Sequence, residues 1–544
     1  MQKTYKGIIV DAKNKRQFKG EVIVESGKII AVNECDHDME NYILPGLIDS
    51  HVHIESSMTV PSSFAPMAVA RGTVAVVTDP HEIANVLGEE GINYMIDDAK
   101  KAPLKCYFGV PSCVPATPFE ASGATLNAEA VDRLLARNDL HFLCEMMNFP
   151  GVIFEDKEVM AKIHSAQKYG KVIDGHIPGI FGDDLKKYVS AGITTDHECF
   201  TYEEAVEKIK LGMKVLIREG SAAKNFDALY GLVDEFPNDV MLCTDDSHPD
   251  TLLEEGHIDK LFRSGLEKGL DIYNLIQVSV LNPIAHYGLN VGKLEIGDQA
   301  DFIVVDNLEA FNVQQTFIDG ECVYDNGRTL FQSEEGDVVN KFNRSEIDLE
   351  SIKLPQEEGK VRVIVAQEGE LITGQELAEP KVENGCVVSD LENDILKMVV
   401  LNRYENTPAQ IGFIKNIGLE KGAIASSIAH DSHNIIAVGT TDEDLVAVIN
   451  KLIENKGGIV VGDSNEQLDL PLEIAGLMTR KSGVETAARY KQLEEKAHEY
   501  GTPLKAPFMT IAFMSLLVIP DLKLGDKGLF DVKKFDFVDL FVKE

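Results

Sequence analysis

Short apolar runs separated by polar turns fill the first 42 residues. The run Gly7–Val10 is followed by a longer one, Glu21–Val32, which a Ser-Gly-Lys turn divides into two halves. Alternating apolar positions with glycine turns are typical of short β-strands joined as hairpins. The pattern therefore predicts a small β unit at the start of the chain.

The pattern changes at Ile43, where short β-type runs begin to alternate with helical segments. Apolar residues recur at the helical spacing of three and four in segments 128–137, 156–170 and 202–212. Eight strands that alternate with helices predict an α/β fold with a (β/α)8 TIM-type barrel over residues 43–286. The expected strands are 43–53, 73–79, 105–110, 141–146, 171–176, 193–197, 214–218 and 240–245.

After the barrel, residues 259–281 have a helical pattern, and residues 292–306 return to a β pattern. This second β segment can pair with the N-terminal one, which predicts a small β-sandwich domain built from both flanks, residues 1–42 plus 287–335. An acidic connector follows. New strands and helices then predict an additional C-terminal α/β domain over residues 345–544.

Charge and cysteine usage narrow the classes of function. The chain has 52 Lys and Arg against 89 Asp and Glu, a net charge of −37, which argues against a nucleic acid polymer or an anionic membrane as partner. The eight cysteines show no CxxC spacing, and the N-terminus has no long apolar run. The longest apolar run, 508–519, is too short to span a bilayer. We therefore expect a cytoplasmic enzyme with reduced thiols.

The clearest chemical signal is the pair His51 and His53 at the end of the first expected barrel strand. Residues two apart in a strand face the same side, so the two imidazoles can bind one metal ion together. Asp49 shares that face and could orient a ligand. The alternative is two histidines in a loop, but the position after Pro-Gly at a strand end favours the metal site.

Four further candidates end later strands: Glu145, His176, His197 and Asp245. Active sites of such barrels are built at the carboxyl ends of several strands. Together with the histidine pair, these donors exceed one tetrahedral site. They suit two divalent ions bridged by a carboxylate and a hydroxide, with Mn²⁺ or Fe²⁺ expected and Zn²⁺ also compatible.

Weaker candidates lie near other strand ends. His81 and Glu82 could contact a substrate or hold an additional ion, or they could simply begin a helix. Glu219, Ser221 and His248 are substrate-binding candidates, and the alternative for them is an ordinary polar turn. His430 and His433 could form a second metal site, but no third ligand is apparent nearby in the sequence, which favours a polar loop.

Several stretches together resemble a known family. PGLIDSHVHIESS (45–57) and GDQADFIVVD (297–306) are similar to segments of the amidohydrolase superfamily, and the whole chain resembles its bacterial-type adenine deaminases. The stretches that carry this resemblance are HIESSM, TDPHEIANV, CEMMNFPGV, DGHIPG, TTDHECFT, REGSAAKN, CTDDSHPD and, in the C-terminal part, IAHDSHNIIAVGT.

The resemblance implies hydrolytic deamination of adenine to hypoxanthine and ammonia, a reaction of purine salvage, by a metal-bound hydroxide at a binuclear site. It implies that His51 and His53 bind one ion, that His176 and His197 bind the second, and that Glu145 bridges them. Asp245 would ligate metal and act as the general base. The expected partners are adenine and water, and a homo-oligomer is expected, with a dimer favoured.

The sequence differs in two places from motifs found in members of the superfamily, and both differences affect the expected number of metal ions. The fourth expected strand ends without a lysine that could be carboxylated, and His176 does not begin an HxxE run, which favours a binuclear site. Two alternatives remain at this point: a cyclic amide hydrolase of the same superfamily, and a non-catalytic, metal-stabilised binding protein. The second would have no need of a base such as Asp245.

Overall fold

The computed structural model describes residues 2–221, 223–332 and 336–543, so the expected domain boundary at residue 335 lies outside the described part. The chain divides into two compact units. The barrel unit comprises Met1–Pro80, Asn93–Ser112 and Asn127–Glu335. The C-terminal unit comprises His81–Ile92, Cys113–Leu126 and Gly336–Glu544.

In the barrel unit, both flanks of the barrel contribute to one eight-stranded sheet, in the order β17-β16-β15-β14-β4-β1-β2-β3. Strand β4 joins the flanks, because it pairs in parallel with β1 and antiparallel with β14. The bounds are β1 Lys3–Asp11, β2 Arg16–Glu25, β3 Lys28–Glu34, β4 Tyr42–Pro45, β14 Phe302–Val305, β15 Val313–Ile318, β16 Glu321–Asp325 and β17 Arg328–Thr329.

These strands form a single sheet where two facing sheets were expected. Register shifts interrupt the pairing of β2 with β3, of β14 with β15 and of β15 with β16. Such bulges bend strands and increase their twist. Residues from both parts of the sheet, including Ile9, Val22, Phe302 and Phe317, consequently share one apolar core.

The expected strand 43–53 is broken at Gly46. Strand β4 ends at Pro45 within the eight-stranded sheet, and β5, Leu47–His53, begins the parallel strands of the barrel. A Cβ on Gly46 would lie 2.3 Å from Cγ1 of Val74, so the Val74 side chain packs too closely against the Gly46 backbone to leave room for a side chain there. The break places the histidine pair on a strand of its own.

We expect the substitution Gly46→Ala to lower the free energy of unfolding by about 1–3 kcal/mol, because the added methyl must displace Val74 or the backbone. Denaturant unfolding followed by circular dichroism measures this change. Gly231→Ala is the matched control, since the nearest atom to its added Cβ is Cε2 of Tyr202 at 3.7 Å. Equal stability of the two variants would contradict this account of Gly46.

The strands that follow β5 are parallel and alternate with helices, as predicted. Their pairings are β5-β6-β7, β8-β9 and β10-β11-β12, and the short β13 after β12 pairs with β5, so that the last strand segment meets the first. This is a TIM-barrel-like fold. The bounds are β6 Thr73–Thr78, β7 Lys105–Phe108, β8 Phe142–Met146, β9 Val172–Gly175, β10 Thr195–Asp196, β11 Lys214–Arg218, β12 Val240–Cys243 and β13 Asp245–Asp246.

The helical periodicity at 128–137, 156–170 and 202–212 corresponds to α4, α6 and α8, but the helix expected over 259–281 is divided. Gly269 has a φ of +83°, and Asp271 then caps a new helix by accepting from the amides of Tyr273 and Asn274. The helices of this unit include α1 Pro61–Ala70, α4 Ala128–Leu135, α5 Phe149–Ile153, α6 Lys157–Lys168, α7 Gly182–Ser190, α8 Tyr202–Lys210, α9 Phe226–Leu229, α10 Leu232–Glu235, α11 Pro249–Glu254, α12 Ile258–Glu267, α13 Ile272–Ile276 and α14 Asn282–Tyr287.

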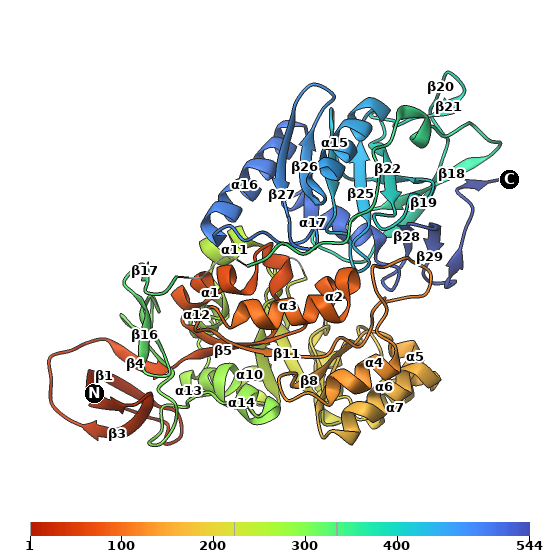
Figure 1. Cartoon of the computed structure of the whole chain (residues 1–544). Helices are drawn as coiled ribbons and strands as arrows, with labels where there is room; N and C mark the ends of the chain where they lie inside the picture. The colour runs from red at the N-terminus through yellow and green to blue at the C-terminus, as the bar shows by residue number, and fades with distance from the viewer. Residues whose placement is uncertain (1, 222, 333–335, 544) are drawn as a thin grey trace. The chain divides into compact units, whose positions relative to one another are not determined.

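The C-terminal unit is built on a mixed sheet in the order β19-β18-β23-β22-β25-β24-β26-β27, with β31 beside β18. Helices α15 and α16 pack on β26 and β27 (Figure 1). The bounds are β18 Lys360–Val365, β19 Gly374–Ala378, β22 Ile395–Leu401, β23 Gln410–Lys415, β24 Ala423–Ser426, β25 Ile435–Gly439, β26 Gly458–Gly462, β27 Gln467–Pro471, β31 Phe541–Val542, α15 Asp442–Asn455, α16 Gly483–Glu499 and α17 Pro507–Ala512.

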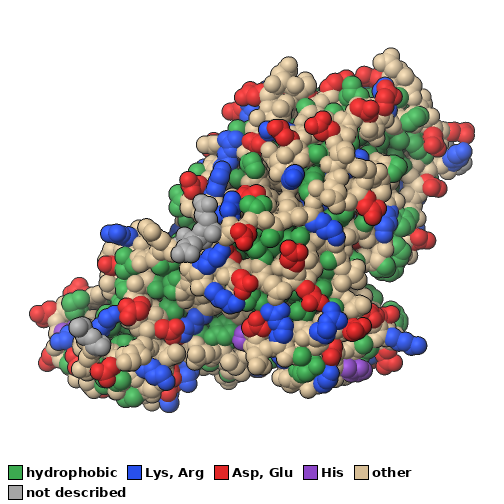
Figure 2. Space-filling view, in the orientation of Figure 1, with side chains coloured by type: hydrophobic (Ala, Val, Ile, Leu, Met, Phe, Trp, Pro, Cys, Tyr) green, Lys and Arg blue, Asp and Glu red, His purple; other side chains and the backbone are tan. Residues whose placement is uncertain are grey.

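Acidic and basic side chains are interspersed on the face of the molecule that Figure 2 shows, and few histidines are visible there. Most histidines named as candidates are instead buried, at 9% exposure or less. Among the described residues, no helix is both long and apolar enough to cross a bilayer.

Candidate metal centre

Strand β5 brings His51 and His53 side by side, as the period of two predicts. Both are buried, at 2% and 3% exposure, and their ring centroids lie 4.8 Å apart. Asp49 does not orient their rings. It accepts from the backbone amides of His51 and Thr244, each at 3.2 Å, and lies 2.9 Å from Nε2 of His257. Asp49 therefore positions the backbone of the first and last strands of the barrel.

Glu145 is the penultimate residue of β8 and lies among histidines from three other strands. Its Oε1 lies 3.3 Å from Nε2 of His53, and its Oε2 lies 2.7 Å from Nδ1 of His176 and 3.4 Å from Nε2 of His197. The carboxylate is 3% exposed. A single buried carboxylate thus reaches the β5 histidines and the later ones, which is the position a bridging ligand requires.

Asp245 follows β12 and faces the same histidines. Its Oδ1 lies 3.4 Å from Nε2 of His51 and 3.2 Å from Nε2 of His53. Arg218, the last residue of β11, donates to Oδ2 at 2.6 Å. Asp245 has a φ of +55°, a conformation uncommon for a residue with a side chain and frequent at functional sites.

The electrostatics of this cluster follow from its burial and its mixed charges. Burial raises the pKa of Glu145, but the three surrounding histidines outweigh it and hold the pKa well below its usual range. Burial likewise raises the pKa of Asp245, and the charge of Arg218 with His51 and His53 holds that pKa well below its usual range. Burial lowers the pKa of His197, yet Glu145 and Asp245 bring it to about 9. Both carboxylates are therefore ionised at neutral pH.

The donors fit divalent metal ions. Three overlapping groups have ligand atoms within 4.8 Å of one another: His51 with His53 and Asp245; His51 with Glu145 and His197; and His176 with His197 and Glu198. Nε2 of His51 is buried without a hydrogen bond among the described residues. Imidazole and carboxylate donors at this spacing suit Mn²⁺, Fe²⁺ or Zn²⁺, and the overlap of the groups suits more than one ion.

Two members of this site were not among the candidates from sequence. Glu198 directly follows His197, is 2% exposed, and lies 3.4 Å from Nε2 of His197. Arg218 donates to both Glu198 and Asp245. The available signal was a charged residue at the end of a buried strand, which is costly unless it is paired. Arg218 thereby couples the two carboxylates on either side of β11.

A buried lysine supports the strand that carries His197. Lys208 of α8 donates to Asp196 at 2.8 Å, to Glu204 at 2.7 Å and to the carbonyl of Ile177 at 2.7 Å. Asp196 in turn accepts from the amide of Ile177. This network joins β10 to the segment that follows His176.

We expect Lys208→Met to lower the free energy of unfolding by about 3–5 kcal/mol, because it leaves Asp196 and Glu204 as buried, unpaired charges. Lys210→Met, an exposed position on the same helix, is the matched control and should change stability little. Thermal and denaturant unfolding of both variants measure the difference. If the Lys208 variant were as stable as the control, the network would make no measurable contribution to the free energy of unfolding.

The weaker candidates have varied surroundings. Glu219 lies 3.6 Å from Nζ of Lys260 and accepts from the amide of Phe226, which is a structural pairing. Ser221 accepts from the amide of His248 at 2.8 Å and donates to Thr251, so Ser221 and His248 lie together. The remaining two, His81 and Glu82, begin α2, His81–Leu87, in the C-terminal unit.

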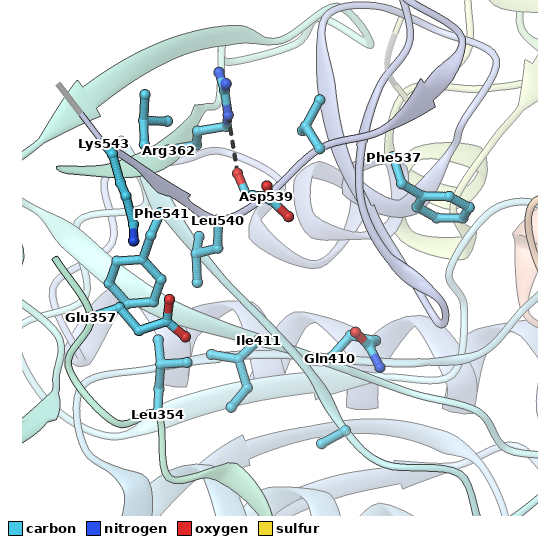
Figure 3. Close-up of a pocket in the computed structure, with 13 residues that line it drawn as sticks. Leu354, Glu357, Arg362, Gln410, Ile411, Phe537, Asp539, Leu540, Phe541 and Lys543 are labelled. Carbon is cyan, nitrogen blue, oxygen red and sulfur yellow. Dashed lines mark hydrogen bonds between the residues drawn. The ribbon is translucent and has the colours of Figure 1, made fainter. Parts of the chain in front are cut away.

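A separate pocket of about 910 Å³ lies in the C-terminal unit (Figure 3). It is lined in part by Leu354, Arg362 and Phe541, and Arg362 donates to the carbonyl of Asp539 at 3.1 Å. None of the residues that line it is among the metal donors. We therefore do not place the chemistry of the barrel unit in this pocket.

Comparisons with known proteins place this site in a family. A family profile described as the amidohydrolase family matches residues 42–323, and one described as the adenine deaminase C-terminal domain matches residues 370–536. The adenine deaminase of Methanosarcina barkeri is 69% identical and aligns with 99% of this chain and all of its own.

More distant relatives carry the same name. The adenine deaminase of Parabacteroides distasonis is 49% identical over 99% of this chain and 98% of its own. That of Borreliella burgdorferi is 43% identical over 97% of this chain and 98% of its own. Identity at this level over whole chains confirms the resemblance drawn from the sequence motifs. The chain therefore belongs to the amidohydrolase family and, within it, to the family of adenine deaminases.

Proposed function

We propose that this chain hydrolyses adenine to hypoxanthine and ammonia. Water adds at C6 of the purine, the bond from C6 to the exocyclic nitrogen breaks, and that nitrogen leaves as ammonia. The observation that carries the proposal is the buried cluster of four histidines and two carboxylates in a chain whose relatives are named adenine deaminase. The comparisons do not favour the cyclic amide hydrolase or the non-catalytic binding protein.

We assign His51 and His53 to one divalent cation, His176 and His197 to a second, and Glu145 to the position between them. Membership of the amidohydrolase family implies a divalent metal, and these nitrogen and oxygen donors suit Mn²⁺ or Fe²⁺, with Zn²⁺ compatible. When bound, such cations supply Lewis acidity, which polarises a substrate and lowers the pKa of water toward neutrality.

Asp245 is the residue that we assign to proton transfer. Its neighbours Arg218, His51 and His53 keep the carboxylate ionised, so it is available as a base. It accepts a proton from the attacking water and returns it to the ring or to the departing amine. Because Arg218 also contacts Glu198, the guanidinium holds Asp245 in one orientation during both transfers.

The division of the chain is also a proposal. We divide it into a small β domain of residues 1–42 plus 287–335, a (β/α)8 barrel of residues 43–286 and a C-terminal domain of residues 345–544. Pairing of β4 with β1 and β14 supports moving the first boundary to Gly46.

We further propose a cytoplasmic homodimer acting in purine salvage. His81, Glu82, Glu219, Ser221 and His248 remain candidates for contacts with the base.

Purified protein loaded with Mn²⁺ and given adenine tests the reaction by the release of ammonia and the appearance of hypoxanthine. Cytosine, guanine and a hydantoin are the matched comparison substrates, the last of which reports ring opening. We expect turnover of adenine in preference to all three. Ring opening of the hydantoin without deamination of adenine would favour the cyclic amide hydrolase, and no turnover of any of them would overturn the proposal.

A further inference from the structure

The C-terminal unit contains a second buried cluster of metal-type donors. Glu82 lies on α2, and His430 and His433 lie on the loop between β24 and β25. Their exposed fractions are 1%, 5% and 0%. One ligand atom from each lies within 4.8 Å of the other two. Glu82 supplies a third metal-type donor that the sequence around His430 does not reveal, because it comes from far upstream in the chain.

The distance between His433 and Glu82 suits a shared ion better than a direct hydrogen bond. Nε2 of His433 lies 3.9 Å from Oε2 of Glu82, which is too long for a hydrogen bond. Donors that each lie about 2.0–2.2 Å from one tetrahedral ion are roughly 3–4 Å apart from one another. The observed separation falls in that range, and the ring centroids of His430 and His433 are 5.5 Å apart.

His433 is the residue whose burial most needs an explanation. Neither of its ring nitrogens has a hydrogen-bond partner among the residues that the structure describes. A buried nitrogen in that state costs free energy unless a water or an ion satisfies it. A neutral imidazole offers the lone pair of one ring nitrogen as a metal donor.

The backbone and ring contacts hold these donors in place. The amide of His433 donates to the carbonyl of Ala429 at 2.8 Å, and its own carbonyl accepts from Nη1 of Arg403 at 3.2 Å. The ring of His430 stacks on Phe513, with centroids 4.4 Å apart and planes at 9°. Fixed side chains of this kind lose little conformational freedom when they bind a ligand.

Further charges surround the cluster. Oδ1 of Asp431 lies 3.8 Å from Nδ1 of His430 and 3.9 Å from Nε2 of His81. The buried Arg403 opposes a cation, but its guanidinium is directed at carbonyl and amide oxygens. The carboxylates of Glu82 and Asp431 lie beside the two imidazoles, and a bound cation would offset their negative charge.

We propose that Glu82, His430 and His433 bind a divalent transition-metal ion that is additional to the ions of the barrel cluster. Asp431, whose Oδ1 lies 3.8 Å from Nδ1 of His430, adds negative charge beside the ion. Three protein ligands leave a fourth position for water or a small oxygen or nitrogen ligand. The ion ties α2 to the β24–β25 loop, two parts of the C-terminal unit that are distant in sequence.

Metal stoichiometry tests the proposal independently of activity. Full-length protein is stripped with a chelator, reloaded with Mn²⁺, freed of excess metal and analysed by mass spectrometry. We expect His433→Gln and Glu82→Gln each to hold about one equivalent less than the wild type. His498→Gln is the matched control in the same unit, since His498 is paired with the carbonyl of Leu504, and it should match the wild type.

A second series separates this site from the barrel cluster. The double variant His51→Gln/His53→Gln should still bind an equivalent that is lost when His433→Gln is added, and Mn²⁺ should raise its melting temperature only while His433 is present. If His433→Gln fails to fold, His430→Gln gives the same count. Equal metal content in the wild type and in folded variants at His433 and Glu82 would overturn the proposal, whatever the outcome of the adenine assay.

Discussion

Replacing Asp245 by Asn is expected to lower kcat for adenine by about 10²- to 10⁴-fold, the usual contribution of a general base. The amide has the shape of the carboxylate but accepts no proton at neutral pH. The histidines and Glu145 stay in place, so most of the metal should remain bound. Steady-state ammonia release and metal analysis on the same sample measure the two quantities together.

The control for this substitution is Asp239→Asn, which changes a partly exposed carboxylate that pairs with Lys214 before β12. It should retain both metal and activity. Asp245→Asn with near-normal turnover would remove Asp245 from the role of base. Loss of activity together with loss of all metal would instead make Asp245 chiefly a ligand.

Replacing Glu145 by Gln is expected to reduce the Mn²⁺ content of the barrel cluster from about two equivalents toward one, with a corresponding loss of turnover. The reason is geometric, because the two oxygens of Glu145 lie within 3.4 Å of His53, His176 and His197. An amide offers one neutral oxygen in place of a charged pair. The histidines of β5 would still hold an ion, whereas the second position would lose the carboxylate that it shares with the first.

This measurement is best made in a chain that also carries His433→Gln, so that the C-terminal unit does not contribute to the count. Glu129→Gln, an exposed position on α4, is the matched control. An unchanged metal content in the Glu145 variant would show that another carboxylate bridges. Glu198, 3.4 Å from His197, would then be the next residue to replace.

Much of the barrel could be predicted because strand and helix periodicities are local. Each expected barrel strand contains an observed one, and the six expected donors lie together because parallel strands end at one side of the sheet. The break at Gly46 could not be predicted, because it depends on how closely Val74 approaches. The N-terminal and post-barrel strands form a single sheet in place of a sandwich. This depends on β-bulges whose positions cannot be predicted from the amino-acid composition of the strands.

The partners of charged residues were harder to foresee than their positions. Arg218 was visible as the end of a strand, but its pairing with Glu198 and Asp245 depends on three strands meeting. Glu82 and His433 are separated by most of the chain, so no local spacing links them. Sequence reasoning therefore grouped the donors that share a strand register. It named Glu82, His430 and His433 separately but could not show that they lie together, because only tertiary packing brings them close.

The pairing of β4 with β14 has a consequence for synthesis of the protein on the ribosome. Strand β4 ends at Pro45, and its antiparallel neighbour begins at Phe302. At roughly 5–20 residues per second, the nascent N-terminal strands wait on the order of tens of seconds before the sheet can be completed. During that time the edge of β4 that later pairs with β14 stays unpaired, so the nascent chain carries an exposed strand edge until β14 has left the ribosome.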